Sequence, residues 1–120
     1  EIIYCIGEPL SVREQGKEQV ISYLSEQLSK IDLSYTNLII AYEPIWAIGS
    51  GVSAKIEDIE SVASEIKSLS KMPLLYGGSV NEDNINNIVS ISNIDGVLVG
   101  SASLDENVFL KLIQNGEKQC

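Results

Sequence analysis

Four short apolar runs, each followed by a segment with helical periodicity, constrain the fold of this 120-residue chain most strongly. The runs predict strands near residues 2–6, 38–43, 73–76 and 96–100. Continuous apolar strands that alternate with helices predict a parallel sheet covered on both faces, in the order β-α-β-α-β-α-β-α. The sequence therefore predicts an α/β fold, and no linker, low-complexity tract or charge block divides the chain.

The expected helices have apolar residues at intervals of three and four. They cover residues 20–31, 56–69 and 85–89, and a last short helix runs through Val108, Leu112 and Ile113. Asn81 is expected to cap the third helix. Ser103 and Glu106 have the spacing of a capping box for the last helix, and Gly116 is expected to end it.

Four strand–helix units are too few to close a barrel, which takes eight units and typically about 250 residues. From the pattern alone, the alternative is a small open sheet of the flavodoxin type. The chain opens on Glu1, with neither a methionine nor the basic start of a signal peptide, so we expect a piece of a longer polypeptide or a processed chain.

The charge balance excludes several classes of partner. The formal net charge of −9 leaves no basic patch for nucleic acid or for an anionic membrane surface. The absence of histidine from the sequence removes imidazole acid–base chemistry and most zinc sites. An anionic metabolite stays compatible with this balance, because backbone N–H groups bind phosphate without Lys or Arg.

The two cysteines, Cys5 and Cys120, lie at opposite ends of the chain. Cysteines without tight spacing indicate reduced thiols, and no apolar run approaches the roughly 20 residues that span a bilayer. We therefore expect a cytoplasmic protein. Cys5 lies in an apolar run, which predicts a buried, unreactive thiol.

The segment Ala41-Tyr-Glu-Pro-Ile-Trp-Ala-Ile-Gly-Ser-Gly51 says most about function. It places one carboxylate, Glu43, at the end of a buried strand, and its apolar neighbours predict a desolvated, strong base. A stiff Pro44-Ile45-Trp46 step then begins a connection that is longer than usual. This layout is typical of an active site with a lid. The alternative is a solvated Glu before a plain loop.

Two glycine-containing segments, Tyr76-Gly-Gly-Ser-Val80 and Gly96-Val-Leu-Val-Gly-Ser-Ala-Ser-Leu104, follow or contain the last two strands. Two adjacent glycines are common in tight turns, so the first segment has an ordinary structural explanation. The functional interpretation is a bare backbone nest at a helix N-terminus, which holds an anion through N–H groups and the helix dipole.

These three segments, in this order, resemble the catalytic-glutamate, lid and phosphate motifs of the triosephosphate isomerase family. The stretch Ile3-Tyr-Cys-Ile-Gly-Glu8 matches the same family. The similarity runs from residue 2 to about residue 112 and covers strands five to eight of a TIM (β/α)8 barrel. The resemblance implies that residues 1–120 are a (β/α)4 half-barrel with parallel strands, a single partial domain.

The resemblance also implies the chemistry. Family members interconvert dihydroxyacetone phosphate and D-glyceraldehyde 3-phosphate through an enediolate, in glycolysis and gluconeogenesis, without metal or organic cofactor. It implies that Glu43 is the catalytic base. The implied phosphate-binding residues are Gly49, Ser79, Gly100 and Ser101. The implied lid and hinge residues are Pro44, Ile45, Trp46, Ala47, Ile48, Gly51, Tyr76 and Glu8.

For two of these residues a second interpretation is open. Glu8 is expected to accept a hydrogen bond from the Trp46 indole, or else to be an ordinary Glu near a helix start. The family usually has a second glycine where this chain has Ser101, and a positive φ there would strain a serine.

The resemblance implies that this half lacks essential groups. The family also uses a Lys and an Asn after the first barrel strand and a His after the fourth, and none has a counterpart here. The isolated chain is therefore expected to be inactive and to pair with the missing N-terminal half or with a second copy of itself. The complete protein is implied to be a homodimer.

A different class of function is an autonomous or engineered half-barrel scaffold, which is not catalytic and self-associates through strand edges and an apolar inner face. Another phosphate-binding barrel, of the indole-glycerol-phosphate type, would share the nest. It would lack the sequence Glu43-Pro44-Ile45-Trp46, which argues against it.

Overall fold

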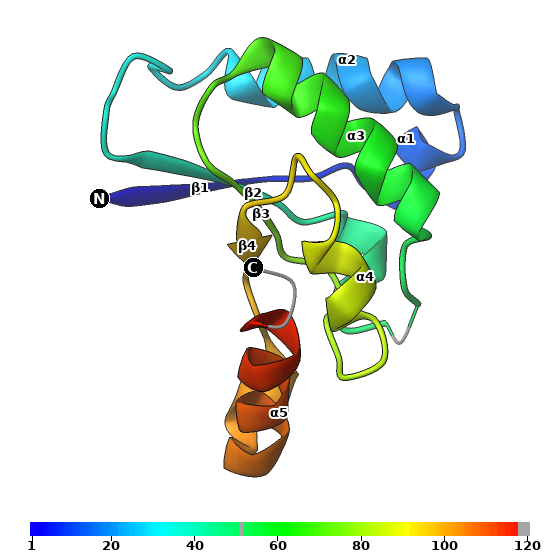
Figure 1. The fold of residues 1–120 in the computed structure, drawn as a ribbon. Coiled ribbons are helices and arrows are strands. Elements are labelled where there is room, and N and C mark those ends of the chain that lie inside the picture. The colour runs from blue at the N-terminus through cyan, green and yellow to red at the C-terminus, as the bar shows by residue number, and fades with distance from the viewer. Residues whose placement is uncertain (51, 118–120) are drawn as a thin grey trace.

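The computed structural model describes residues 1–50 and 52–117, which form a parallel four-stranded sheet with helices (Figure 1). The expected hinge residue Gly51 and the cysteine Cys120 lie outside the described residues. The strands are β1 (Ile2–Ile6), β2 (Leu38–Tyr42), β3 (Leu74–Tyr76) and β4 (Gly96–Val97).

The order of the strands in the sheet is their order in the sequence, β1-β2-β3-β4. A barrel wall has this sequential order, whereas a flavodoxin-type sheet reverses direction at a switch point. The alternative of a flavodoxin-type sheet is therefore wrong. The fourth strand is shorter than predicted, because after Val97 the pairing continues only through the Leu98 N–H to the Tyr76 carbonyl (2.9 Å), and a 3₁₀ turn begins at Ser101.

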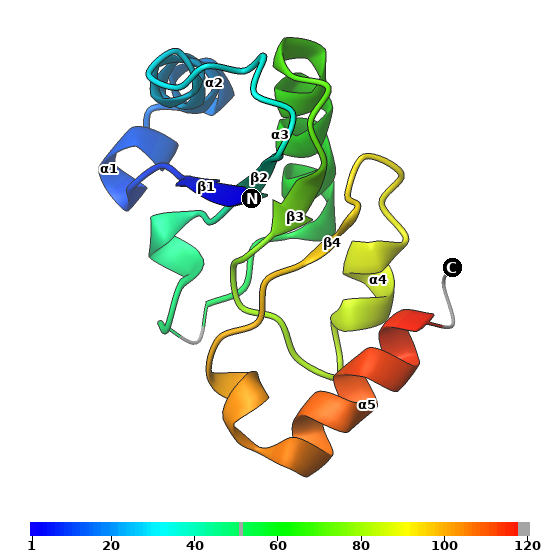
Figure 2. The ribbon, with the colours of Figure 1, turned by 90° about the vertical axis from the view of Figure 1, so that its left-hand side faces the viewer.

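The helices lie around one side of the sheet, with α2, α3, α4 and α5 following one another in space (Figure 2). They are α1 (Leu10–Arg13), α2 (Lys17–Leu28), α3 (Ile56–Leu69), α4 (Ile85–Val89) and α5 (Glu106–Glu117), with the 3₁₀ turns η1 (Ile45–Ala47) and η2 (Ser101–Leu104). None of the helices in the described ranges is both long and apolar enough to cross a bilayer.

The main core lies between the sheet and these helices. Alternate residues of β2, Leu38, Ile40 and Tyr42, are buried there. The buried residues of α3 recur at the spacing that the sequence predicts; they are Ile59, Val62, Ala63 and Ile66. The packing of this face explains why the second and third strand–helix units match the sequence pattern closely.

The opposite face of the sheet is open at β1, so the prediction that both faces are covered is wrong for the described chain. Ile3 keeps 47% of its surface exposed, and Cys5, on the same face, is also exposed. The predicted burial of Cys5 is therefore wrong as well. An apolar strand signals a buried position, but in a barrel wall the inner face is buried only when further strands close the ring.

Side chains accept hydrogen bonds from backbone N–H groups at the N-terminal ends of the last two helices. The N-cap of α4 is Asn84, so the prediction that Asn81 caps this helix is wrong. The Asn81 side-chain oxygen instead accepts the N–H of Asn84 (3.0 Å), in the turn that leads into α4. At α5 the predicted capping box is wrong, because the Ser103 hydroxyl donates to the carbonyl of Gly100, just before η2. The Asp105 carboxylate instead accepts the first free N–H groups of α5. The helix also includes Gly116, where the sequence predicts its end.

An ion pair on the outer surface ties α3 to the start of β3. The Lys67 ammonium donates to the Asp95 carboxylate (2.7 Å), which also accepts the Leu74 N–H (2.8 Å). Partial burial alone would raise the pKa of Asp95, but the hydrogen bonds from Lys67 and from Leu74 hold that pKa below its ordinary value. The ionised form of Asp95 therefore favours the folded state.

We expect Asp95→Asn to lower the free energy of unfolding by about 1 kcal/mol at pH 7, because a half-exposed charge pair is lost. Since the folded-state pKa lies below the unfolded one, this stabilisation is present above about pH 4 and is lost as the pH falls through the folded-state value. Urea unfolding at pH 7 and at pH 3 measures it. Glu60→Gln, an exposed change on α3, is the control. An Asp95→Asn effect of equal size at both pH values would contradict the assignment.

Candidate active site

The four strands end at the same edge of the sheet because they pair in register. Ile6 lies opposite Tyr42, Tyr42 opposite Tyr76, and Tyr76 opposite Val97. The loops that follow these residues therefore leave the sheet side by side. Apart from Tyr76, which ends β3, they contain every candidate site residue of the sequence analysis that the structure describes.

Glu43 directly follows β2 and is half-buried, with its N–H donating to the Ile6 carbonyl (2.7 Å). Its side chain lies against the backbone of Gly77. A Cβ at Gly77 would lie 2.6 Å from the Glu43 Cγ and 3.1 Å from the Oε1 atom. Only glycine leaves room for the carboxylate in this position.

Two of the sequence neighbours expected to surround Glu43 lie elsewhere. The Tyr42 hydroxyl donates to Glu8 on the other side of the sheet, and Ile45 is 53% exposed. The thiol of Cys5 lies beside the Glu43 carboxylate instead. Cys5 is exposed as a whole, but partial burial of its thiol raises the pKa, and the hydrogen bond and the negative charge of Glu43 raise it further. The sequence pattern did not point to Cys5, although its pairing with Ala41, two positions before Glu43, carries that information.

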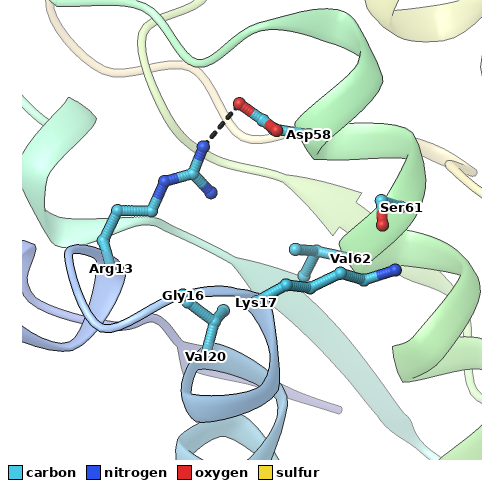
Figure 3. A pocket seen from close by; sticks show the side chains of 7 residues that line it. All are labelled: Arg13, Gly16, Lys17, Val20, Asp58, Ser61 and Val62. Carbon is cyan, nitrogen blue, oxygen red and sulfur yellow. Dashed lines mark hydrogen bonds and ion pairs between the residues drawn. The ribbon is translucent and has the colours of Figure 1, made fainter.

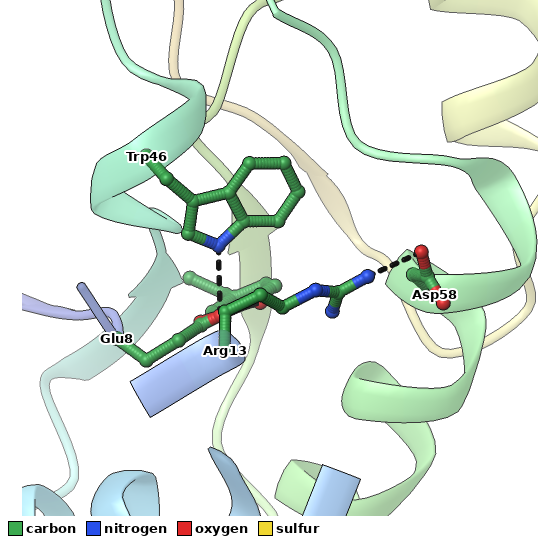
Figure 4. A network of polar contacts seen from close by, with 5 residues as sticks. Glu8, Arg13, Trp46 and Asp58 are labelled. Carbon is green, nitrogen blue, oxygen red and sulfur yellow. Dashed lines mark hydrogen bonds and ion pairs between the residues drawn. The ribbon is translucent and has the colours of Figure 1, made fainter. Parts of the chain in front are cut away.

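Glu8 is completely buried, which contradicts the alternative of an ordinary Glu near a helix start. Its carboxylate accepts hydrogen bonds from the Tyr42 hydroxyl (2.7 and 3.1 Å) and from the Trp46 indole N–H (3.1 Å) (Figure 4). The expected Glu8–Trp46 contact is therefore present. Burial first, and then the charge of Glu8, raise the pKa of Tyr42 far above its ordinary value. Tyr42 thus stays a hydrogen-bond donor to Glu8.

The loop after Glu43 begins with a buried Pro44 and the turn η1. The Ala47 carbonyl accepts the Ser79 hydroxyl (2.6 Å), which fastens this part of the loop to the segment after β3. Beyond it, Ile48 and Gly49 are exposed. Gly49 has φ +65°, a left-handed conformation that glycine adopts without strain. The loop is therefore held firmly at its start and exposed at its tip.

A hollow of about 560 Å³ lies at this edge of the sheet, and all four expected phosphate-binding residues line it: Gly49, Ser79, Gly100 and Ser101. Gly77 lines the same hollow, and it is the residue against which Glu43 packs. No residue other than glycine in the described ranges has a positive φ, so Ser101 is not strained. Asp105, which the sequence analysis did not single out for this site, also lines the hollow, with its carboxylate engaged in capping α5.

Tyr76 lies behind the hollow with its side chain buried, and its hydroxyl has no hydrogen-bond partner among the described residues. The hydroxyl packs on Gly78, where a Cβ would lie 2.1 Å away. Burial, and secondarily the charge of Glu8, raise the pKa of Tyr76 to about 12. Tyr76 also lines a second hollow of about 390 Å³ with Ser53 and Ala54, at the far end of the loop. Tyr76 therefore carries a buried donor without a partner among the described residues, and it shares a hollow with the end of the loop.

The site thus combines a carboxylate at the end of one strand with a backbone-lined hollow after the next two. This arrangement is that of the edge of a (β/α)-barrel wall at which the strands end. Within residues 1–50 and 52–117, no group of three or more His, Cys, Asp or Glu side chains is placed to hold a metal ion.

Comparison with known proteins assigns the family. A family model described as Triosephosphate isomerase matches residues 1–116. The chain is 59% identical over 112 residues to the triosephosphate isomerase of Campylobacter concisus, covering 93% of this chain and 48% of that protein. It is 56% identical over 113 residues to that of a Sulfurovum species (94% and 49%) and 54% identical over 114 residues to that of Helicobacter hepaticus (95% and 48%). The chain belongs to the triosephosphate isomerase family, and it spans about half the length of these curated relatives.

We expect Gly77→Ala to displace the Glu43 carboxylate, because the new Cβ would overlap the Glu43 Cγ while meeting no backbone atom among its three nearest contacts. The protein should still fold, and turnover of dihydroxyacetone phosphate by the complete protein should fall on the order of 10²-fold. Steady-state kinetics, with a crystal structure of the variant, measures both effects.

Gly116→Ala is the matched control, because its Cβ would lie 3.9 Å from the nearest atom, the Ile85 Cγ1. It should leave turnover unchanged. Normal turnover in Gly77→Ala would mean that the position of Glu43 against Gly77 is unimportant.

Proposed function

We propose that this chain is the C-terminal half, strands five to eight, of a triosephosphate isomerase that interconverts dihydroxyacetone phosphate and D-glyceraldehyde 3-phosphate. One observation carries the proposal: the Glu43 side chain packs on Gly77, which lines the same hollow as Gly49, Ser79, Gly100 and Ser101. A base and an anion site within reach of one small molecule suit a phosphorylated triose. Residues 1–120 then form a single partial domain.

Glu43 acts as the base. Its carboxylate removes a proton from the carbon next to the substrate carbonyl and returns that proton to the neighbouring carbon, which passes the substrate through an enediolate. The carboxylate is regenerated, so the reaction needs no oxidant or cofactor. The substrate phosphate is held by backbone N–H groups at the start of η2 and in the Gly77-Gly78-Ser79 turn, a mode that requires no basic side chain.

The loop of residues 44–54 acts as the lid that covers the bound substrate. Pro44, Ile45, Trp46 and Ala47 form its anchored start, and Ile48 and Gly49 belong to its tip. The unpartnered Tyr76 hydroxyl supports a movement of this loop, because a buried donor without a partner costs about 1–3 kcal/mol and Tyr76 lines a hollow together with Ser53 and Ala54. Closure would give that hydroxyl a backbone partner and exclude water from the enediolate.

The chain needs a partner to complete the ring of strands. The exposed inner-face residues Ile3 and Cys5 support pairing with the N-terminal half of the barrel. That half would also supply the active-site lysine, which has no counterpart here, and the imidazole that this sequence lacks. The complete protein is proposed to be a cytoplasmic homodimer that binds neither nucleic acid nor membranes. The second candidate, a scaffold half-barrel that pairs with itself, is supported by the same open face.

We expect Glu43→Gln and Glu43→Asp to reduce kcat of the complete protein by about 10²- to 10⁴-fold, the usual contribution of a positioned base. The amide cannot accept the proton, and the shorter acid is misplaced. The KM for dihydroxyacetone phosphate should change little, since separate backbone groups hold the phosphate. Glu60→Gln is the control for loss of one surface charge. Near-normal turnover in Glu43→Gln would eliminate Glu43 as the base.

We expect the isolated 120-residue chain to self-associate or aggregate, and to show no isomerase activity above buffer. An open strand edge and an exposed apolar inner face promote association. Light scattering with a dye that binds apolar surface tests this, and adding the N-terminal half should restore a defined complex with activity. A stable compact monomer that binds no dye would refute the need for a partner.

A further inference from the structure

Arg13, the last residue of α1, contacts the start of the lid and the helix that follows the lid (Figure 4). Its guanidinium carbon lies 4.9 Å from the centroid of the Trp46 ring, in the turn that begins the lid. The same guanidinium forms an ion pair with Asp58, in the first turn of α3 and four positions after the lid ends at Ala54. One side chain therefore joins the segments that enter and leave the lid.

Trp46 is held on two sides. Its indole N–H donates to Glu8 (3.1 Å), and Arg13 covers the ring. A guanidinium over the indole face attracts it through the ring quadrupole, more strongly when partly shielded from water. The Arg13 side chain keeps only 27% of its surface exposed. Trp46 cannot leave this position without losing both contacts.

Arg13 is also tied to the buried acid of this cluster. Burial and the Glu8 carboxylate raise the pKa of Tyr42, and the charge of Arg13 opposes that rise. The guanidinium is thus within electrostatic reach of the Glu8–Tyr42 pair. A buried carboxylate such as Glu8 requires compensation, and Arg13 supplies positive charge from the side that also faces Trp46.

The Arg13 side chain reaches Asp58 on the helix side of the sheet. This is away from the hollow that the expected phosphate-binding residues line, called the phosphate hollow below. Arg13 lines a hollow of about 240 Å³ between α2 and α3, and its side chain extends to Asp58 across the upper part of it (Figure 3). Lys17 lines the same hollow and extends toward Ser61 and Val62 instead. None of the residues that line this hollow also lines the phosphate hollow.

We propose that Arg13 is a positioning residue for the lid: by holding Trp46 and Asp58 together, it stabilises the lid position seen here and sets how readily the lid closes. This inference rests on the proposed function of residues 44–54. In the observed position the contacts of Arg13, Trp46 and Glu8 are satisfied, whereas the Tyr76 hydroxyl is unpartnered. Loss of the Arg13 contacts therefore shifts the lid toward the closed position.

The test uses the complete protein grown with 5-fluorotryptophan, with the Trp46 fluorine resonance assigned through Trp46→Phe. Arg13→Met should move this resonance in the free protein and change the ratio of lid positions roughly threefold to tenfold. Asp58→Asn should move it in the same direction. The resonance shift in the double variant should be little larger than the shift in either single variant, because both residues act through one contact. Arg13→Lys keeps the charge but loses the planar group, so its fluorine resonance should lie between those of the wild type and Arg13→Met.

Kinetics with dihydroxyacetone phosphate give a second readout. Arg13→Met should lower KM and kcat together, since a lid that closes more readily holds substrate longer and releases product more slowly. Lys17→Met is the control: it removes the same charge from the same hollow without a Trp46 contact. It should leave the fluorine resonance and both kinetic constants unchanged.

A wild-type fluorine resonance and wild-type KM in Arg13→Met would overturn the inference, and so would an equal shift in Lys17→Met. If Arg13→Met fails to fold, Asp58→Asn decides: an unmoved resonance there overturns the inference, and a shifted one supports it. If the wild-type protein does not isomerise triose phosphates, the proposed function fails, and the fluorine comparison still decides whether Arg13 positions Trp46.

Discussion

Parallel pairing in register joins Ile6 to Tyr42, Tyr42 to Tyr76 and Tyr76 to Val97, and every part of the candidate site depends on it. Because the strands end together, the base and the two glycine-containing segments meet at one edge. A slip of one residue in β2 would turn Glu43 toward the helices and Tyr42 toward the hollow, since side chains alternate between faces. Register thus determines which side of the sheet carries the carboxylate.

The same alternation separates two polar systems that are adjacent in sequence. Glu43 lies with Cys5 and Gly77 on the inner face, where substrate would bind. Tyr42 lies with Glu8 and Trp46 on the helix side, in a cluster that Arg13 completes. The first system is open to a small molecule, whereas the second is buried or shielded and fixes the start of the lid. One strand therefore connects the chemistry to the loop that would protect it.

Long periodic segments and strand-end motifs were predictable from sequence, because each is a local pattern that is compatible with only one kind of local structure. Strands β1 to β3 and helices α2 and α3 belong to this group. The single turns α1, η1 and η2 were not predicted, since three or four residues carry no period. Ser103 and Asp105, two positions apart, are both favourable N-cap residues. Ser103 lies in the 3₁₀ turn and hydrogen-bonds there, so Asp105 caps α5. The burial of Cys5 was misjudged because an apolar run does not show that one face of its strand is open.

A crystal structure of the complete protein carrying Glu43→Gln, with dihydroxyacetone phosphate bound, measures the relation between base and anion site directly. The geometry predicts a phosphate held by backbone N–H groups of Ser79, Gly100 and Ser101, with the lid tip at Gly49 above it. The residue 43 side chain should lie within about 3–3.5 Å of the reacting carbons. A phosphate bound outside this hollow, or a residue 43 side chain on the helix side of the sheet, would contradict the proposed site.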